Sequence, residues 1–485
     1  MMELQMDRKR ILLLVAAVVF AGLLFYAVVS GFAYVRIAVV GLPFLLVALW
    51  FAVYQPRWYA VLLVLALPVS LNLEDIGMGF GISLPGEIMV LLMAALIIIN
   101  LLTGRYINTR ILKHPVTIAI LVNLVWMGVT SLTSTMPLIS AKYMIMRIAY
   151  LLVFYLFFVQ VFSNVRSLQQ FVWLYAASLL IVIAVILLRH AQFGFIQQVN
   201  AYVAKPFFKD HTIYGASVAM LLPFFAARSF ISSQDSYLPR ALSAIVFPLL
   251  LLAAFLSYSR AVWLSIAVAI VAAALLLLKV KLRYILLGIA ALVATLLYFR
   301  EPLMFRVTQV QSERGSDIRE HATSIANLNT SASNLERINR WETGIDMFFE
   351  KPSLGFGPGT YPFQYAPYQD KANMTRISTY FGDKGGVHSE YLKPLSESGW
   401  PGLVSFLAII LLTAATGLKL VYYNKSKTVK LLAASFLLGL TTYYTHGFVN
   451  FFLHTDKVAV LFWGMTAGIV ALDMNYPLQR TNHSE

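Results

Sequence analysis

Apolar runs long enough to cross a lipid bilayer recur along most of the chain, and they constrain its fold more than any other feature. They fall at about residues 11–30, 35–54, 58–73, 87–102, 114–134, 143–163, 168–188, 212–230, 241–257, 261–278, 283–299, 399–418, 429–450 and 457–474. A bilayer-spanning helix needs about 20 mostly apolar residues, so the pattern predicts an all-α polytopic membrane protein with about 12–14 transmembrane helices.

Composition excludes the other fold classes. Apolar residues make up 59% of the 485-residue chain and charged residues only 12%, about half the charged share of a soluble globular protein. A single water-soluble core and a disordered, collagen-like or coiled-coil chain are therefore excluded. The chain has no cysteine, so disulfides, thiolate metal sites and a cysteine nucleophile are excluded as well.

The formal net charge of +15 is interpreted as a signal of membrane topology. If the N-terminus lies inside, the cytoplasmic connections contain eighteen Lys and Arg residues, and the short outer connections contain seven. Cytoplasmic loops of membrane proteins are enriched in Lys and Arg. The asymmetry predicts that both termini are cytoplasmic, and it accounts for the basic balance without a nucleic-acid partner.

Hydropathy falls between about residues 300 and 398. This segment is predicted to form one large extracytoplasmic loop subdomain. It separates an N-terminal transmembrane bundle at 1–299 from C-terminal transmembrane helices and a short cytoplasmic tail at 399–485.

Local patterns predict structure within this loop. Ser333-Asn-Leu-Glu336 matches a capping box, and apolar residues then recur at helical spacing until Pro352. The pattern predicts an amphipathic helix at about 334–350. The turn Gly355-Phe-Gly357-Pro-Gly359 follows, and its glycines and proline predict a tight, irregular backbone.

Arg260 is the sharpest anomaly in the charge pattern, because it stands between two apolar runs with almost no loop to hold it. A cation at the membrane interface lies in a low dielectric and attracts an anion strongly. The alternative is an arginine that snorkels to lipid headgroups. Arg147, inside the sixth run, raises the same question, with an internal salt bridge as its alternative.

Two arginines of the predicted loop helix are also candidates. Arg337 and Arg340 precede Trp341 and are flanked by Glu336 and Glu342. Such residues can form local ion pairs on a solvated helix face. Guanidinium groups also present a planar fork of donors to phosphate oxygens. Arginines that converge from a loop and a membrane edge would suit a pyrophosphate-bearing substrate.

His388 lies where the chain re-enters the membrane, in the run His388-Ser389-Glu390-Tyr391-Leu392. An imidazole can accept a proton near neutral pH, so both a general base and a structural histidine are open interpretations. Gly399 and Gly402, on either side of Trp400-Pro401, bring the chain sharply into the next run and are expected to hold this histidine in a defined place.

Motifs for other chemistries are weak or absent. The glycines at 355–359 are not followed by GK[ST], so a nucleotide site is not predicted. His211, His446 and His454 lack metal-ligand spacing, and Asp210-His211 is interpreted as the start of a helix. The residues support neither a metal nor a cofactor.

Four short motifs, in this order, resemble those of the O-antigen ligase and polymerase superfamily of bacterial envelope glycosyltransferases. They are Ser259-Arg260-Ala261, Arg337-Ile-Asn-Arg340-Trp341, the Lys351–Gly359 turn, and His388-Ser389 followed by nine residues, Gly399 and Gly402. The last is similar to the H-[NSQ]-x9-G-x-x-[GTY] signature of O-antigen ligases. The motif-bearing region covers about 255–420.

The resemblance implies a metal-independent transferase of the all-helical glycosyltransferase C type that needs no cofactor. Such enzymes take a glycan from undecaprenyl pyrophosphate at the outer face of the bacterial inner membrane and join it to a sugar acceptor such as lipid A core. The family's essential residues map to Arg260 and Arg337, which would stabilise pyrophosphate, and to His388 as general base. Further candidates for substrate binding are Arg340, Ser389, Glu390 and Gly357.

Several functions stay open at this stage. Ligation and repeat-unit polymerisation share one bond chemistry, and the His-Ser-x9-Gly pattern favours the ligase. A polysaccharide transporter or flippase would usually place functional charges near the midplane, in broken helices arranged as repeats, whereas the polar residues here gather in one outer loop and its rim. A non-catalytic envelope scaffold would tolerate replacement of Arg260, Arg337 and His388.

Overall fold

A computed structural model describes residues 33–76, 81–104, 108–231, 237–298, 321–371, 374, 378 and 385–477. The fold is helical apart from two short strands, β1 (Leu71–Asn72) and β2 (Ser83–Leu84), which pair antiparallel with Leu71 opposite Leu84. The predicted apolar run at 11–30 lies outside the described residues, as does part of the long hydrophilic segment.

Each of the other predicted apolar runs coincides with a helix. The bundle consists of α2 (Ala33–Tyr54), α3 (Pro56–Val69), α4 (Gly86–Leu102), α5 (Thr109–Leu112), α6 (Pro115–Leu132), α7 (Pro137–Tyr150), the π-helical η2 (Leu151–Phe157), α8 (Phe158–Val161), α9 (Val165–Gln192), α10 (Asn200–Ala204), α11 (His211–Phe230), α12 (Tyr237–Leu256), α13 (Arg260–Leu277), α14 (Leu282–Tyr298), α18 (Leu392–Tyr423), α19 (Lys427–His446) and α20 (Asp456–Asn475). Short 3₁₀ turns form η1 (Glu74–Ile76) and η3 (Gln197–Val199).

Eight of the described helices are long and apolar enough to cross a membrane, and three shorter apolar helices accompany them. The fold is therefore an all-α polytopic membrane protein, as the sequence predicted. The number of helices that cross, and the likeness to glycosyltransferase C enzymes, stay predictions.

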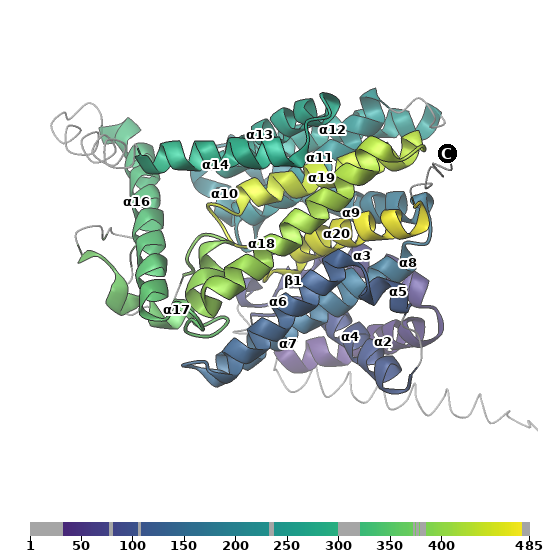
Figure 1. Ribbon diagram of the computed structural model, residues 1–485, viewed down its shortest axis with the longest axis horizontal. Coiled ribbons are helices and arrows are strands. Elements are labelled where there is room, and N and C mark those ends of the chain that lie inside the picture. Colours follow the sequence, from purple (N-terminus) through teal and green to yellow (C-terminus); the bar gives the residue numbers. More distant parts are fainter. Residues whose placement is uncertain are drawn as a thin grey trace, which may run out of the picture.

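Burial separates central helices from peripheral ones. The most apolar window is 83% buried in α20 and 78% buried in α11, against 28% in α12 and 17% in α13. In Figure 1, α18 and α20 cross the middle of the bundle, and both pack against α19. A helix buried on all sides lies in a core, whereas one with a wide exposed apolar face borders lipid.

The described part of the hydrophilic segment contains α16 (His321–Glu350), α17 (Tyr361–Gln364) and the 3₁₀ turn η5 (Ala366–Tyr368). Figure 1 shows α16 running across the ends of α14 and α18. A small cluster of buried apolar side chains stabilises this segment apart from the bundle core; it contains Met347, Phe356, Tyr361, Tyr365 and Val387.

The predicted start of the loop helix was wrong. The helix begins at His321 rather than near residue 334, so Ser333 lies inside α16 and does not cap it. Ser, Thr and Asn are only a few tenths of a kcal/mol less favourable in helix interiors than good helix formers. A run rich in these residues therefore does not mark a boundary by itself.

Left-handed glycines shape the return of the chain to the membrane, as predicted. Gly357 has φ 111°, and a Cβ there would overlap the side chain of Ser134 in the α6–α7 turn. Gly399 has φ 69° and interrupts α18, so the first turn of that helix packs against the loop before the helix enters the bundle. Beside this kink the Trp400 amide donates to the carbonyl oxygen of Pro352 at 2.9 Å.

Candidate functional site

Arg260 is the first residue of α13, and its side chain is exposed. Ser259 precedes it in extended backbone, and Tyr258 is left-handed with φ 48°. A cation at a helix N-terminus faces the positive end of the helix dipole and loses a few tenths of a kcal/mol. The position is thus electrostatically unfavourable unless an anion lies nearby.

Arg337 and Arg340 occupy the same helix, α16, but differ in their surroundings. Arg340 is buried, and its Nε donates to Glu336 at 2.6 Å while its Nη2 donates to the Tyr365 hydroxyl at 3.0 Å. Its guanidinium also lies 4.3 Å from the ring centroid of Tyr365. Arg337 is half-buried, and its Nε is enclosed with no hydrogen-bond partner among the described residues.

His388 is held in an uncommon backbone conformation with φ 51°. Its carbonyl oxygen accepts a hydrogen bond of 3.1 Å from the indole Nε1 of Trp341 on α16. Its ring meets that of Phe451 edge-on, with centroids 6.2 Å apart. The loop helix thereby fixes the backbone of this residue, and the α19–α20 connection fixes its ring.

The charges of these residues act on one another. Burial and then the charge of Arg260 lower the pKa of Arg337, and the charge of Asp210 offsets this only in part. Burial, then Arg337 and Arg340, lower the pKa of His388 to about 3. Residues from α13, α16 and the segment before α18 therefore share one electrostatic environment, in which the imidazole is neutral at pH 7.

Asp210 is the member of this environment that the sequence analysis missed as a site residue. It caps α11, as the predicted helix start implied, with Oδ1 accepting from the Thr212 amide at 2.9 Å. Burial alone would raise its pKa, but the His211 contact at 2.8 Å and the Thr212 amide lower it to about 2. A capping Asp followed by His was the available signal, but spacing alone did not connect it to residues more than 120 positions away.

The other predicted binding residues have structural partners. Ser389 Oγ accepts from the amides of Tyr391 and Leu392 at 3.2 and 3.3 Å, which caps the start of α18. Glu390 is buried, and its Oε1 accepts from the Tyr443 hydroxyl at 2.5 Å and from the amides of Phe452 and Leu453 at 2.6 and 2.8 Å.

Gly357 likewise has a structural contact, because its amide donates to the Glu397 carbonyl oxygen at 2.8 Å. Arg340 engages the loop core as described above. In this structure these four candidates hold the frame around Arg260, Arg337 and His388, and their roles in substrate binding stay predictions. Among the described residues there is no cluster of three His, Asp or Glu side chains suited to a metal ion.

Comparison with known families found a match. Residues 245–407 match the family described as O-antigen ligase. This region is therefore similar to that family. It contains Arg260, Arg337 and His388, and it overlaps most of the predicted motif region at about 255–420. The comparison with curated proteins found no match.

Proposed function

We propose that this protein is an O-antigen ligase-like glycosyltransferase that moves a glycan from undecaprenyl pyrophosphate to a sugar acceptor. The observation that carries the proposal is the convergence of Arg260, Arg337 and His388 from three segments, with an enclosed Arg337 Nε that has no partner in the described structure. A buried donor without an acceptor is costly, and a pyrophosphate oxygen would satisfy it.

The two arginines would bind the part of the donor on which charge develops. As the glycosidic C–O bond breaks, the electron pair passes to the pyrophosphate oxygen. Burial, and then repulsion from Arg260, already lower the pKa of Arg337. A bound polyanion would remove that repulsion and gain from both cations, and this interaction strengthens as the leaving group becomes more negative.

His388 would accept the proton of the acceptor hydroxyl while that oxygen forms the new bond to the anomeric carbon. Neutral imidazole is the form that can do so, and burial and the two arginines keep it neutral. Binding of the pyrophosphate would offset the arginine charges, so the pKa of His388 would rise toward the operating pH when the donor is present. The products of this step are then the glycosylated acceptor, undecaprenyl pyrophosphate and protonated His388.

We infer that the protein lies in the bacterial inner membrane with both termini cytoplasmic and that the site faces the extracytoplasmic side. The acceptor is lipid A core or a similar saccharide. A repeat-unit polymerase of the same superfamily is the alternative function, because the same three residues would serve a second lipid-linked glycan as acceptor.

The test is reconstitution of the full chain in lipid nanodiscs with an undecaprenyl pyrophosphate-linked glycan and candidate acceptors. We expect His388→Ala and Arg260→Ala to abolish product while the protein stays folded. Arg166→Ala is the matched control, because that arginine is exposed on α9 and should retain activity. A product ladder without added acceptor identifies a polymerase, and a single transfer identifies a ligase. Full activity of both site variants would exclude the proposed roles.

A further inference from the structure

A second cavity lies beside α7, away from the three residues used above. It has a volume of about 350 Å³, within the range of small-molecule sites. Most of its lining is apolar or aromatic and comes from α7, the glycine-rich turn, α17 and the α19–α20 connection. The lining residues are Ile139, Lys142, Tyr143, Met146, Arg147, Tyr150, Gly359, Phe363, Leu453 and His454. We call it the α7 cavity.

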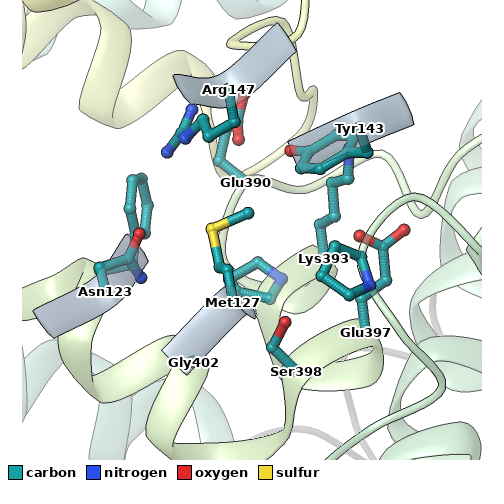
Figure 2. A pocket seen from close by; sticks show the side chains of 12 residues that line it. Asn123, Met127, Tyr143, Arg147, Glu390, Lys393, Glu397, Ser398 and Gly402 are labelled. Atoms are coloured by element: carbon teal, nitrogen blue, oxygen red, sulfur yellow. The ribbon is translucent and has the colours of Figure 1, made fainter. Parts of the chain in front are cut away.

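A polar chamber adjoins the α7 cavity and shares Tyr143 and Arg147 with it. Figure 2 shows these two side chains facing the same space as Lys393 and Glu397 from α18. The ammonium of Lys393 lies 4.4 Å from the ring centroid of Tyr143 and 5.0 Å from that of Phe451. The α7 cavity thus adjoins a chamber in which buried cations and carboxylates face one another.

Arg147 is the unexplained member of this group. Its side chain is only 7% exposed, and its Nε has no hydrogen-bond partner among the described residues. Its guanidinium lies 4.9 Å from the ring centroid of Trp463, and the described structure gives it no salt bridge. The internal salt bridge that the sequence left open as its alternative is thus not formed there. A charged side chain inside a membrane helix is costly and usually functional.

The nearby carboxylates are engaged by other groups. Figure 2 places Glu390 next to Arg147, but its Oε1 accepts from the backbone amides of Phe452 and Leu453. Glu397 accepts from the amides of Gly359 and Tyr361 at 2.8 and 3.3 Å. Both carboxylates line the polar chamber, whereas no Asp or Glu among the described residues lines the α7 cavity itself, so that Arg147 and exposed Lys142 give the cavity a cationic lining.

The outer face of α7 is suited to a lipid. Leu138 and Ile145 are 87% and 60% exposed, as expected for side chains that border acyl chains. The π-helix η2 begins only four residues after Arg147, and π-helical turns are frequent at functional sites. A ligand that matches both the apolar lining and the buried guanidinium carries a phosphate on a long apolar chain.

We propose that the α7 cavity binds an anionic lipid through its phosphate or pyrophosphate, with Arg147 as the phosphate ligand. Resting on the proposed function, this lipid is the acceptor, so the acceptor glycan is itself carried on a phosphorylated lipid. Phe451 connects the two sites, because its ring contacts that of His388 and stacks on His454 at 5.0 Å. A glycan that extends from the cavity past Phe451 reaches the general base.

The experiment measures binding without turnover. The full chain in nanodiscs carries Arg260→Gln and Arg337→Gln to remove the donor site, and undecaprenyl phosphate is titrated and detected by native mass spectrometry. We expect one bound lipid, with affinity reduced at least tenfold by a further Arg147→Gln and unchanged by a further Arg166→Gln. Inorganic pyrophosphate and uncharged undecaprenol should each bind at least tenfold more weakly, since each lacks one half of the recognised chemistry.

Two further variants keep the test decisive if Arg147→Gln fails to fold. Arg147→Lys retains the charge and should restore part of the affinity, whereas Met146→Trp fills the cavity and should abolish binding. Unchanged affinity in Arg147→Gln or in Met146→Trp overturns the inference, and so does equal binding of undecaprenol.

Turnover separates this inference from the proposed function. In the chain with an intact donor site, Arg147→Gln should raise the KM for a phospholipid-linked acceptor at least tenfold and leave the donor KM unchanged. Glycan transfer with an unaltered acceptor KM refutes the lipid site alone. Lipid binding that depends on Arg147 in a chain that transfers no glycan refutes the proposed function alone.

Discussion

The indole of Trp341 offers a direct test of how His388 is positioned. Its Nε1 donates to the His388 carbonyl oxygen at 3.1 Å, and His388 has φ 51°. A left-handed non-glycine residue costs about 1–3 kcal/mol and persists only where its surroundings hold it. Trp341→Phe keeps the ring and removes the donor, which should weaken this hold.

The size of the effect follows from the hydrogen bond. Such a bond contributes about 0.5–1.5 kcal/mol net, which corresponds to about a 2- to 13-fold change in the population of the held conformation. We expect the single-turnover rate of glycan transfer to fall by this factor. The donor affinity should be unchanged, because phenylalanine preserves α16 and leaves Arg337 in place.

The assay compares single-turnover transfer by the native chain, Trp341→Phe and Trp400→Phe. Trp400 is 54% exposed and lies at the kink of α18, so its replacement controls for the loss of an indole near the site. A native rate in Trp341→Phe would refute the argument, as would an equal loss in Trp400→Phe.

Three further predictions concern the frame of the site and its pH dependence. Gly357→Ala should lower the free energy of unfolding by more than about 2 kcal/mol in thermal or denaturant unfolding, because φ 111° and an overlapping serine both oppose a Cβ. Gly41→Ala, inside α2 with no neighbour within 4 Å, should instead be neutral or stabilise the helix slightly, and equal destabilisation by the two would contradict this. Arg340→Met should destabilise the loop by about 3–5 kcal/mol, since Glu336 would remain as an uncompensated buried charge. The double variant Arg340→Met with Glu336→Leu should recover part of this loss in the same unfolding measurement. The pKa of His388 in the uncomplexed protein is about 3, against an ordinary 6.5, so the acid limb of the kcat/KM profile should lie far below neutral pH. Donor binding should move the acid limb of the kcat profile to higher pH. A kcat limb at or below the kcat/KM limb would contradict the assigned cause.

The lowered pKa of His388 also makes the stability of the folded protein depend on pH. Unfolded chains protonate His388 near pH 6.5, whereas the folded protein resists protonation until about pH 3. Between these values the unfolded state binds more protons, so stability falls as the pH falls through this window. His388→Gln should reduce the acid sensitivity of unfolding between pH 6.5 and 3.

The helices could be predicted from the sequence because a bilayer leaves the chain little choice. Long apolar runs must satisfy their backbone hydrogen bonds internally, and helices do so. The start of α16 was missed for the converse reason. A hydrophilic sequence rich in Ser, Thr and Asn is under no such constraint and is compatible with helix as well as loop.

The site was only partly predictable. Arg260, Arg337 and His388 could be nominated from motif resemblance, but their convergence depends on the packing of α16 against α18 and of α13 and α18 against α19. Glu390 shows what short-range patterns cannot reveal, because its partners Tyr443 and Phe452 lie 53 and 62 residues further along the chain. Arg147 was anomalous in the sequence, but only the fold shows the cavity that it faces.

The most direct test of the central claim is the single-turnover rate of glycan transfer by His388→Gln at saturating donor and acceptor. A positioned general base contributes about 10²- to 10⁴-fold to such a step. We predict a fall of this size with unchanged donor affinity, because Arg260 and Arg337 remain. A rate within twofold of the native protein would contradict the assignment of proton transfer to His388 and, with it, the mechanism proposed for this site.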